Sequence, residues 1–410
     1  MSTATVVPRR AWGRVIGLSL VLGICFGLTL NSLGLLTLPI RAAFRGSHEE
    51  AASIATAFLI SMTIAMPLAG WLVDRLPARP VMVAGAVLAG GGYLLASRAG
   101  SLPVFIVALA ATGAGIGFCT YVPAATLVTR WIPAQRQGLA FGILLAAVSV
   151  GGMIFPLALN QAIEVLGWRP AIAFAGVAIL SVCAPLLFFL AQSPTNGSSS
   201  ASARQEVQGG GASVGEALRS GQFWLWTLML LLFTLSSLSI LMALVPYLVA
   251  MGYSSTQAAM ANTGVGAATL AGNFIFGALS NRWGAERTLV VGALASAAGI
   301  LCLLAAGDAA LGVAAVVAFA LLWGTTFNLA NQLSPTLLLD ALGSAHFGSL
   351  LGIGNLLAGV VSAFGPQGVG HLVDVTHAYT WPLAGCAVLM VAAVPPLIAL
   401  HHTRPAESSV

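Results

Sequence analysis

Three amide side chains, Asn328, Asn331 and Gln332, lie close together within a long apolar stretch of the chain. Residues three apart share one face of an α-helix, so Asn328 and Asn331 would present their amides together, with Gln332 one step on. Because an amide both donates and accepts hydrogen bonds, such a group could hold one polar solute. It could equally join neighbouring helices by hydrogen bonds, and both interpretations stay open.

Other neutral polar side chains stand singly inside apolar stretches. An asparagine in hydrocarbon needs a hydrogen-bond partner and rarely faces lipid, so some of these residues are expected to line a solute cavity. Tyr121 and Asn273 are the first two candidates, and the alternative for each single residue is a bond that joins two helices. The predicted substrate-binding set is Asn31, Tyr121, Asn273, Asn328, Asn331, Gln332 and Asn355.

Charged residues are concentrated in short segments between the apolar stretches. One such segment occurs twice, 207 residues apart: Gly70-x3-Asp74-Arg75-x3-Arg79 and, in part, Gly277-x3-Asn281-Arg282. A second set repeats at an offset of 210: Gly138, Gly142, Pro156 and Glu164 correspond to Gly348, Gly352, Pro366 and Asp374. Two stretches that agree on nearly one offset indicate a chain built from two copies of one unit.

Acidic and histidine side chains that could relay protons do not occur in the middle of the apolar stretches. Glu164, His371 and Asp374 lie at the ends of such stretches, with His371 one helical turn before Asp374. We interpret these three either as an outer gate or proton-entry cluster, or as solvated helix ends. No residue set at helical spacing suggests an enzyme active site, so no catalytic residue is predicted.

The composition is that of an integral membrane protein. The mean hydropathy is +0.96 and 7% of residues are charged, whereas soluble domains have about 25% charged residues. All 16 basic residues are arginine, which excludes the lysine-dependent phosphate-binding loop. These arginines are dispersed, which argues against nucleic acid as a partner. The five cysteines form no CxxC pair, and no metal or cofactor is predicted.

The apolar stretches have the length of membrane-spanning helices, roughly 20 residues each. The predicted fold is all-α, with twelve transmembrane helices in two six-helix halves: about 12–40, 51–73, 80–97, 102–128, 137–163, 170–191, 223–251, 257–280, 286–306, 309–336, 346–372 and 379–400. A Ser/Gly-rich segment between the halves is typical of a flexible linker. We expect an N-terminal half at 1–191, a cytoplasmic linker at 192–220, a C-terminal half at 221–402 and a cytoplasmic tail at 403–410.

The distribution of arginine predicts the orientation in the membrane. With a cytoplasmic N-terminus, twelve arginines fall on the cytoplasmic side and four on the other, as the positive-inside rule requires. Both termini are then cytoplasmic, and the expected location is the cell (inner) membrane.

Glycine pairs four residues apart predict where helices pack closely. Small residues on one helical face let two backbones approach, and glycine does so most. The predicted pairs are Gly23/Gly27, Gly113/Gly117, Gly138/Gly142 and Gly348/Gly352.

The twelve spans, the duplication and the segment Gly70–Arg79 after the second helix resemble the major facilitator superfamily over essentially the whole chain. The resemblance implies alternating-access transport without ATP, with substrate near the membrane midplane between the halves. It also implies a conformational latch of the outward-facing state, to which we assign Asp74, Arg75, Arg79, Arg130 and Arg282. Asp74 could accept hydrogen bonds at a helix N-terminus, although these charges could instead serve only to set the topology.

A narrower resemblance is to the monocarboxylate porter and oxalate/formate antiporter branch. It rests on Tyr121-Val-Pro123, Arg130-Trp131-x4-Arg136-x-Gly138, Gly167-Trp168-Arg169, His346-Phe-Gly348 and Gly365-Pro366-x3-Gly370-x3-Asp374. Carboxylate carriers of this branch often place an arginine where this chain has Asn273, and no Lys or Arg occurs between Gly348 and Gly370. An anionic substrate would therefore be held by neutral donors, or the substrate is not an anion.

The first functional hypothesis is a secondary transporter of a small organic solute, a monocarboxylate or related organic acid, and not an enzyme. Export of a neutral or amphipathic metabolite or drug is the alternative. From another class, a non-transporting membrane sensor on a transporter fold stays open, although the linker and tail offer no sizeable extra domain. The expected partners are the solute and the lipid bilayer, with a coupled proton left open and no nucleic acid, and a monomer is expected.

Overall fold

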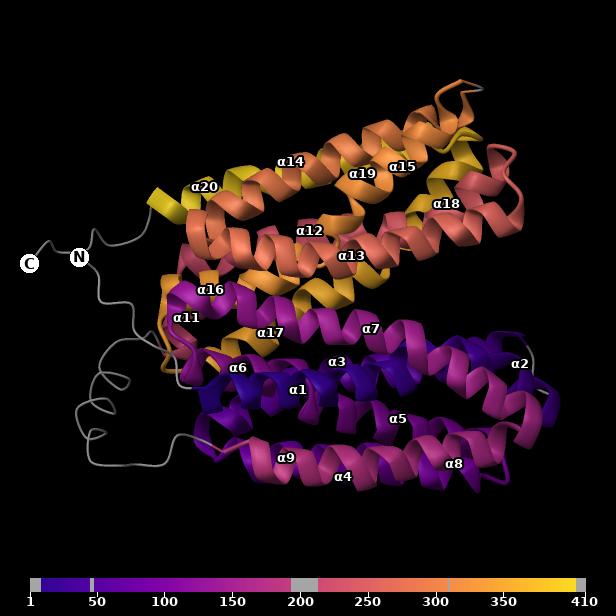
Figure 1. Cartoon of the computed structure of the whole chain (residues 1–410), viewed down its shortest axis with the longest axis vertical. Coiled ribbons are helices and arrows are strands. Elements are labelled where there is room, and N and C mark those ends of the chain that lie inside the picture. Colours follow the sequence, from indigo (N-terminus) through magenta and orange to yellow (C-terminus); the bar gives the residue numbers. More distant parts are fainter. Residues whose placement is uncertain (1–8, 45–47, 193–212, 309, 403–410) are drawn as a thin grey trace, which may run out of the picture. The chain divides into compact units, whose positions relative to one another are not determined.

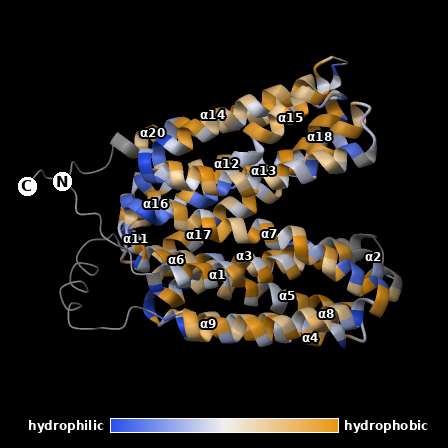
Figure 2. Cartoon of the chain, in the orientation of Figure 1, coloured by the Kyte–Doolittle hydropathy of each residue, from blue (hydrophilic) through white to orange (hydrophobic). Residues whose placement is uncertain are grey.

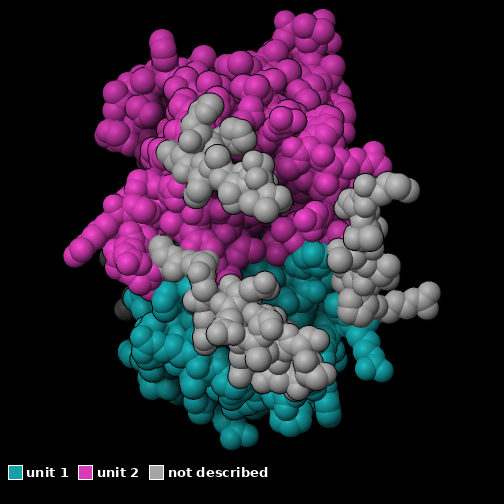
Figure 3. All heavy atoms as spheres, turned by 90° about the vertical axis from the view of Figure 1, so that its left-hand side faces the viewer, with its two compact units in different colours: residues 1–133, 143–210, 345–353 teal, residues 134–142, 211–344, 354–410 magenta. Residues whose placement is uncertain are grey.

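The computed structural model describes residues 9–44, 48–192, 213–308 and 310–402. The secondary-structure elements of these residues are all helices. The chain divides into two compact units, which Figure 3 colours separately. Unit 1 comprises residues 1–133, 143–210 and 345–353, and unit 2 comprises residues 134–142, 211–344 and 354–410.

These units differ from the two predicted halves because two short segments are exchanged. Residues 134–142, at the start of the fifth span, belong to unit 2, and residues 345–353, at the start of the eleventh, belong to unit 1. Most of the predicted linker (193–212) and the predicted tail (403–410) lie outside the described residues. The domain boundaries therefore remain a prediction.

Among the described residues, twelve helical segments are long and apolar enough to cross a membrane, as predicted. In each unit the middles of the helices are mostly hydrophobic, and hydrophilic residues gather toward their ends (Figure 2). A helix satisfies its own backbone hydrogen bonds, so an apolar chain in a bilayer becomes helical. The spans are Arg10–Ser32, Thr56–Arg75, Ala78–Ser97, Leu102–Trp131, Ala134–Leu166, Trp168–Leu190, Gly221–Ala250, Met260–Trp283, Ala285–Gly307, Gly312–Leu342, Phe347–Thr376 and Thr380–Leu400.

Unit 1 is built around α5 (Leu102–Cys119), which packs against α3 (His48–Arg75) and α4 (Ala78–Ser97). Helix α4 also packs against α8 (Trp168–Ala178) and α9 (Ala184–Leu190) (Figure 1). The other helices are α1 (Arg9–Leu28), η1 (Leu30–Ser32), α2 (Leu33–Phe44), α6 (Tyr121–Trp131), η2 (Ile179–Cys183) and most of α7 (Ala134–Leu166). The fully buried Tyr93 of α4 donates through Oη to the Leu28 carbonyl at 2.9 Å, which ties α1 to this core.

Unit 2 is built around α12 (Gly221–Ala250) and α14 (Ala285–Leu303), which both pack against α19 (Thr380–Ala392). The other helices are α11 (Val214–Arg219), α13 (Ser255–Trp283), η3 (Leu304–Gly307), α15 (Gly312–Leu322), η4 (Gly324–Thr326), α16 (Leu329–Leu342), part of α17 (Phe347–Ala363), α18 (Gly365–Thr376) and α20 (Val394–His402). The Tyr247 hydroxyl of α12 donates to the Leu303 carbonyl at 2.8 Å, which joins α12 to α14.

Glycines at the predicted contact positions bring helix backbones together in unit 1. An added Cβ on Gly23 would lie 2.6 Å from the Ala147 carbonyl oxygen, and one on Gly27 would lie 2.6 Å from the Gly151 carbonyl oxygen. Helix α1 therefore touches the backbone of α7 at both positions. The predicted role of this pair in close helix packing is confirmed.

Replacing Gly151 by alanine is expected to destabilise unit 1. The new Cβ would overlap the Gly23 carbonyl and lie 2.9 Å from the Gly23 Cα, and overpacking of this kind costs about 1–3 kcal/mol. The apparent Tm of the purified protein in detergent should fall.

Gly91→Ala is the matched control, because a Cβ at Gly91 of α4 meets nothing within 4 Å. Alanine gains up to about 1 kcal/mol of helix propensity over glycine, so Gly91→Ala should leave the Tm unchanged or raise it slightly. Equal Tm values for the two variants would show that the α1–α7 contact is looser than described.

Candidate functional site

The carboxylate of Asp74, near the end of α3, accepts three hydrogen bonds from the start of α17. Its Oδ1 accepts from the Gly348 N–H at 3.0 Å, and its Oδ2 accepts from the N–H and the hydroxyl of Ser349, each at 2.7 Å. The Leu350 N–H donates to the His346 carbonyl, so Gly348 and Ser349 lie in the first turn, where N–H groups lack an acceptor in their own helix. Asp74 therefore caps α17 from another helix, and the positive end of the helix dipole favours its charge.

A close approach of α3 and α17 makes these hydrogen bonds possible. Gly70 lies one turn before Asp74, and a Cβ there would overlap the Gly348 carbonyl. One turn further along α17, a Cβ on Gly352 would lie 2.5 Å from the Pro67 Cα. The repeat in the sequence had already singled out Gly70 and Gly352. Ser349 was not predicted, because a hydroxyl at the second or third position of a helix is recognisable only when the helix start is known.

The arginines of the predicted latch have separate partners. Arg130 donates through Nη2 to the Val73 carbonyl at 3.1 Å, beside Asp74. The guanidinium of Arg75 lies 4.3 Å from the ring centroid of Trp71, and that of Arg79 lies 5.0 Å from the ring centroid of Phe188. Arg282 is exposed at the end of α13, in unit 2. The structure thus brings Arg130 to the segment of Asp74, and the latch role of the set remains a proposal.

In unit 2, the repeat relates the crossing of α7 and α13 to that of α3 and α17. A neutral side chain joins the helices there. Helices α7 and α13 meet where a Cβ on Gly277 would lie 2.9 Å from the Gly138 carbonyl oxygen. The buried Gln332 of α16 donates through Nε2 to the Gly138 carbonyl at 3.1 Å and to the Asn273 carbonyl at 2.9 Å. Gln332, a predicted substrate-binding residue, therefore has its amide nitrogen engaged in joining α7, α13 and α16.

The span that contains Tyr121 is broken just before that residue. Helix α5 ends at Cys119 and α6 begins at Tyr121, with Thr120 between them at φ −114° and ψ −115°. Pro123 has no N–H to donate to the Cys119 carbonyl, so the hydrogen bond that would continue the helix is missing. Tyr121 is buried at this break, with 7% of its side chain exposed. Discontinuous membrane helices are a frequent location of solute sites.

The repeat-related span in unit 2 is broken as well. The 3-10 turn η4 separates α15 from α16, and Asn328 is the N-cap residue of α16. The Thr326 hydroxyl donates to the Leu322 carbonyl at 3.0 Å, which satisfies a backbone group near the break. Asn328 and Asn331 are half-buried here. Two of the predicted amides therefore lie at a helix break, as Tyr121 does in unit 1.

The remaining candidates lie in different surroundings. The first predicted helix, 12–40, is broken at η1, and Asn31 in this turn is exposed. Asn273 is buried on α13, with 2% exposed, and Asn355 is half-buried on α17. Asn31 and Tyr121 belong to unit 1, and the other five predicted residues belong to unit 2.

The three residues of the predicted outer cluster are all exposed. Glu164, on α7 in unit 1, accepts a hydrogen bond from Asn160 Nδ2 at 2.7 Å. His371 and Asp374 lie on α18 in unit 2. Their exposure fits the interpretation as solvated helix ends, and a common gate remains a prediction.

The groups at the helix breaks are hydroxyls, amides and backbone groups. They can donate and accept hydrogen bonds without carrying charge. In the part of the chain that the structure describes, the arginines of the spans lie near the span ends. Within the same residues, no group of three or more His, Cys, Asp and Glu side chains is placed to hold a metal ion. The arrangement suits binding of a small polar solute.

Comparison with known proteins extends over nearly the whole chain. Residues 18–366 match the family model described as Major Facilitator Superfamily. Monocarboxylate transporter 13 of Bos taurus is 24% identical over 402 residues, which cover 96% of this chain and 91% of that protein. The uncharacterized MFS-type transporter YcxA of Bacillus subtilis (strain 168) is 25% identical over 391 residues, which cover 93% of each chain.

Solved structures show the same fold. The proton:xylose symporter XylE, bound to 6-bromo-6-deoxy-D-glucose, superimposes with a TM-score of 0.73 at 16% identity, covering 96% of both chains. At this identity the similarity concerns the arrangement of helices. It confirms the predicted all-α, twelve-helix architecture.

Replacing Asp74 by asparagine is expected to weaken the contact between α3 and α17. One carboxylate oxygen becomes an NH2 group that would face an N–H donor, and the negative charge at the helix N-terminus is lost. Transport should slow several-fold while the amount of protein in the membrane stays the same, because no apolar span changes. Solute uptake into proteoliposomes at matched protein density measures this.

Asp308→Asn is the matched control, because Asp308 is exposed and accepts hydrogen bonds from the nearby N–H groups of Ala310 and Leu311. A normal transport rate in Asp74→Asn would contradict the latch. Equal slowing in both variants would contradict it too.

Replacing Gln332 by leucine tests whether its amide joins helices. Hydrogen bonds between membrane helices contribute about 0.6 kcal/mol each on average and up to about 1.7 kcal/mol. Loss of both bonds should lower the apparent Tm by a few degrees with little change in solute affinity. Asn331→Leu, one residue away on the same helix, is the comparison. A fall in solute affinity at unchanged Tm in Gln332→Leu would instead place this residue in the solute site.

Proposed function

This chain belongs to the Major Facilitator Superfamily, and we propose that it carries a small monocarboxylate or related organic acid across the membrane by alternating access. The chain is a multi-pass integral membrane protein of a family of transporters. The observation that carries the substrate class is the similarity to monocarboxylate transporters over more than nine-tenths of the chain.

A monocarboxylate would be bound here by neutral donors. The predicted residues that best suit this role are Tyr121, at the break between α5 and α6, and Asn331, near the break between α15 and α16. A hydroxyl or an amide N–H donates to a carboxylate oxygen, and a break frees backbone groups to do the same. Several such donors can hold a single negative charge. When the site is empty, neutral donors do not leave a buried, uncompensated charge as an arginine would.

The cap on α17 supports the alternating-access part of the proposal. Asp74 makes its three hydrogen bonds to backbone and hydroxyl groups of a helix start, so these bonds can break and re-form without moving a span through the membrane. Arg130, bonded to the carbonyl beside Asp74, places a positive charge near this contact. We propose that this contact is made in one transport state and released in the other.

The coupling ion, the orientation in the membrane and the oligomeric state are further parts of this proposal. Relatives in fold include a proton:xylose symporter, so we propose a coupled proton as a partner to be tested. The arginine distribution supports cytoplasmic termini in the cell (inner) membrane, and a monomer as the functional unit stays part of the proposal.

A neutral or amphipathic solute is the second candidate, and one residue favours it. Asn273, at a position where we expect an arginine in carboxylate carriers, is buried with 2% exposed, so an uncharged side chain fills that place. A membrane sensor without transport is the candidate from another class. Saturable uptake of any solute would exclude it.

The test is uptake of labelled solutes into proteoliposomes, with and without an imposed pH gradient. The panel contains lactate, pyruvate, oxalate, an aromatic acid and a neutral sugar. We expect saturable uptake of a monocarboxylate that is stimulated by an inward proton gradient, with a raised KM in Tyr121→Phe because one donor to the solute is lost. Transport of the neutral solute alone would contradict the organic-acid assignment and make Asn273 the mark of a different substrate class.

A further inference from the structure

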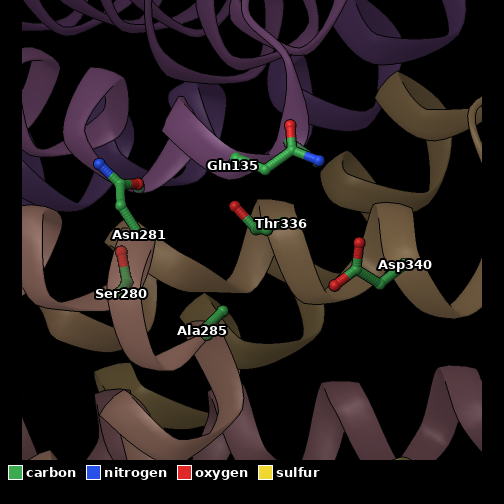
Figure 4. Close-up of a pocket in the computed structure, with 9 residues that line it drawn as sticks. Gln135, Ser280, Asn281, Ala285, Thr336 and Asp340 are labelled. Carbon is green, nitrogen blue, oxygen red and sulfur yellow. The ribbon is translucent and has the colours of Figure 1, made fainter. Parts of the chain in front are cut away.

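Unit 2 contains a cavity of about 230 Å³ at the crossing of α7 and α13. Its lining includes Gln135, Ser280, Asn281, Ala285, Thr336 and Asp340. These residues come from the starts of α7 and α14, the end of α13 and the later turns of α16 (Figure 4). The cavity is separate from the helix breaks to which we assign solute binding.

Two helix N-termini contribute to this cavity. The N-cap residue of α7 is Pro133 and that of α14 is Gly284, and neither makes a side-chain cap hydrogen bond. Proline and glycine have no side-chain acceptor to offer. The first N–H groups of these two long helices therefore lack a cap from their own N-cap residues, and both positive dipole ends lie at the cavity.

A buried hydroxyl points into the same space. Thr336 is 8% exposed, and its Oγ1 has no hydrogen-bond partner among the described residues. Figure 4 shows this hydroxyl directed toward the space between Gln135 and Asn281. A buried hydroxyl without a partner is destabilising, and a ligand in the cavity would supply the missing hydrogen bond.

The crossing of α3 and α17 in unit 1, which the repeat relates to that of α7 and α13, contains a carboxylate that this cavity lacks. There, Asp74 supplies a carboxylate to the start of α17. The repeat places Asn281 at the position of Asp74, so no carboxylate of α13 reaches the corresponding place in unit 2. The cavity lies beside the start of α7, which no carboxylate of α13 caps.

The surrounding charges are compatible with one negative charge. Arg136, Arg282 and Arg287 are exposed and lie one or two residues from lining residues. Asp340 lines the cavity and Glu286 follows the lining residue Ala285, so this part of the chain has three basic and two acidic residues at or next to lining positions. This balance favours a monoanion over a dianion.

We propose that this cavity binds a small monovalent oxyanion, such as a carboxylate, which caps the start of α7 as Asp74 caps the start of α17. The anion accepts hydrogen bonds from the Thr336 hydroxyl, from N–H groups of the α7 start and from the amide of Gln135 or Asn281. By tying α7 to α13 and α16, it stabilises this crossing. Anion binding in this cavity does not depend on which solute is transported.

The test is acetate binding to the purified full-length protein in detergent, measured by isothermal titration calorimetry against sodium chloride at equal ionic strength. We expect saturable binding that Thr336→Val weakens about tenfold, because a hydrogen bond to a charged ligand is lost, and that Thr336→Ser preserves. Asp340→Asn should strengthen binding, since a like charge is removed. Asn281→Asp should abolish binding by placing a carboxylate in the cavity.

Acetate that binds elsewhere on the protein does so equally in Thr336→Val and Thr336→Ser. A difference in acetate affinity between these two variants therefore reports on this cavity and not on the transport site. Equal affinities in these two variants would overturn the proposal, as would acetate heats no larger than those of chloride. Weaker acetate binding in Asp340→Asn would also overturn it, because that result indicates a cation site. Asp340 is exposed, so this variant gives an answer even where Thr336→Val fails to fold.

Discussion

Three hydrogen bonds to the carboxylate of Asp74 hold the first turn of α17 on α3. A helix start needs acceptors for its N–H groups, and a carboxylate 275 positions away from Ser349 in the chain provides them. That geometry requires glycine at 70 and 348, because a side chain at either position would separate the two backbones and lengthen the bonds. It also explains why residues 345–353 belong to unit 1 although the rest of α17 belongs to unit 2.

The two copies of the repeat share the glycines of this crossing and differ in its chemistry. Helix α7 begins at Ala134, so Gly138 lies beyond the first turn and its N–H has an acceptor within the helix. A carboxylate at 281 would find no free N–H group beside Gly138, and the crossing is instead joined by the neutral amide of Gln332. One crossing thus depends on charge and the other on a neutral amide.

The sequence was sufficient for what depends on composition and spacing. Twelve spans follow from apolar length, and the contact of Gly23 and Gly27 with α7 follows from small residues four apart. The helix break at Thr120 was not predicted, although Pro123 is present in the sequence. A hydropathy window averages many residues and does not detect a break at a single one. The partners of Arg75 and Gln332 could not be predicted either. An aromatic ring and two backbone carbonyls become available only through tertiary packing, which no local pattern encodes.

A distance measurement tests, without knowledge of the solute, whether the charge of Asp74 holds the start of α17 on α3. Spin labels replace the exposed Leu76, after α3, and Ala345, before α17, on a background with the five native cysteines substituted. Double electron–electron resonance then compares this protein with the same protein carrying Asp74→Asn. We expect a dominant short distance between the labels, which loses population to longer distances in Asp74→Asn. Identical distance distributions in the two proteins would contradict this expectation.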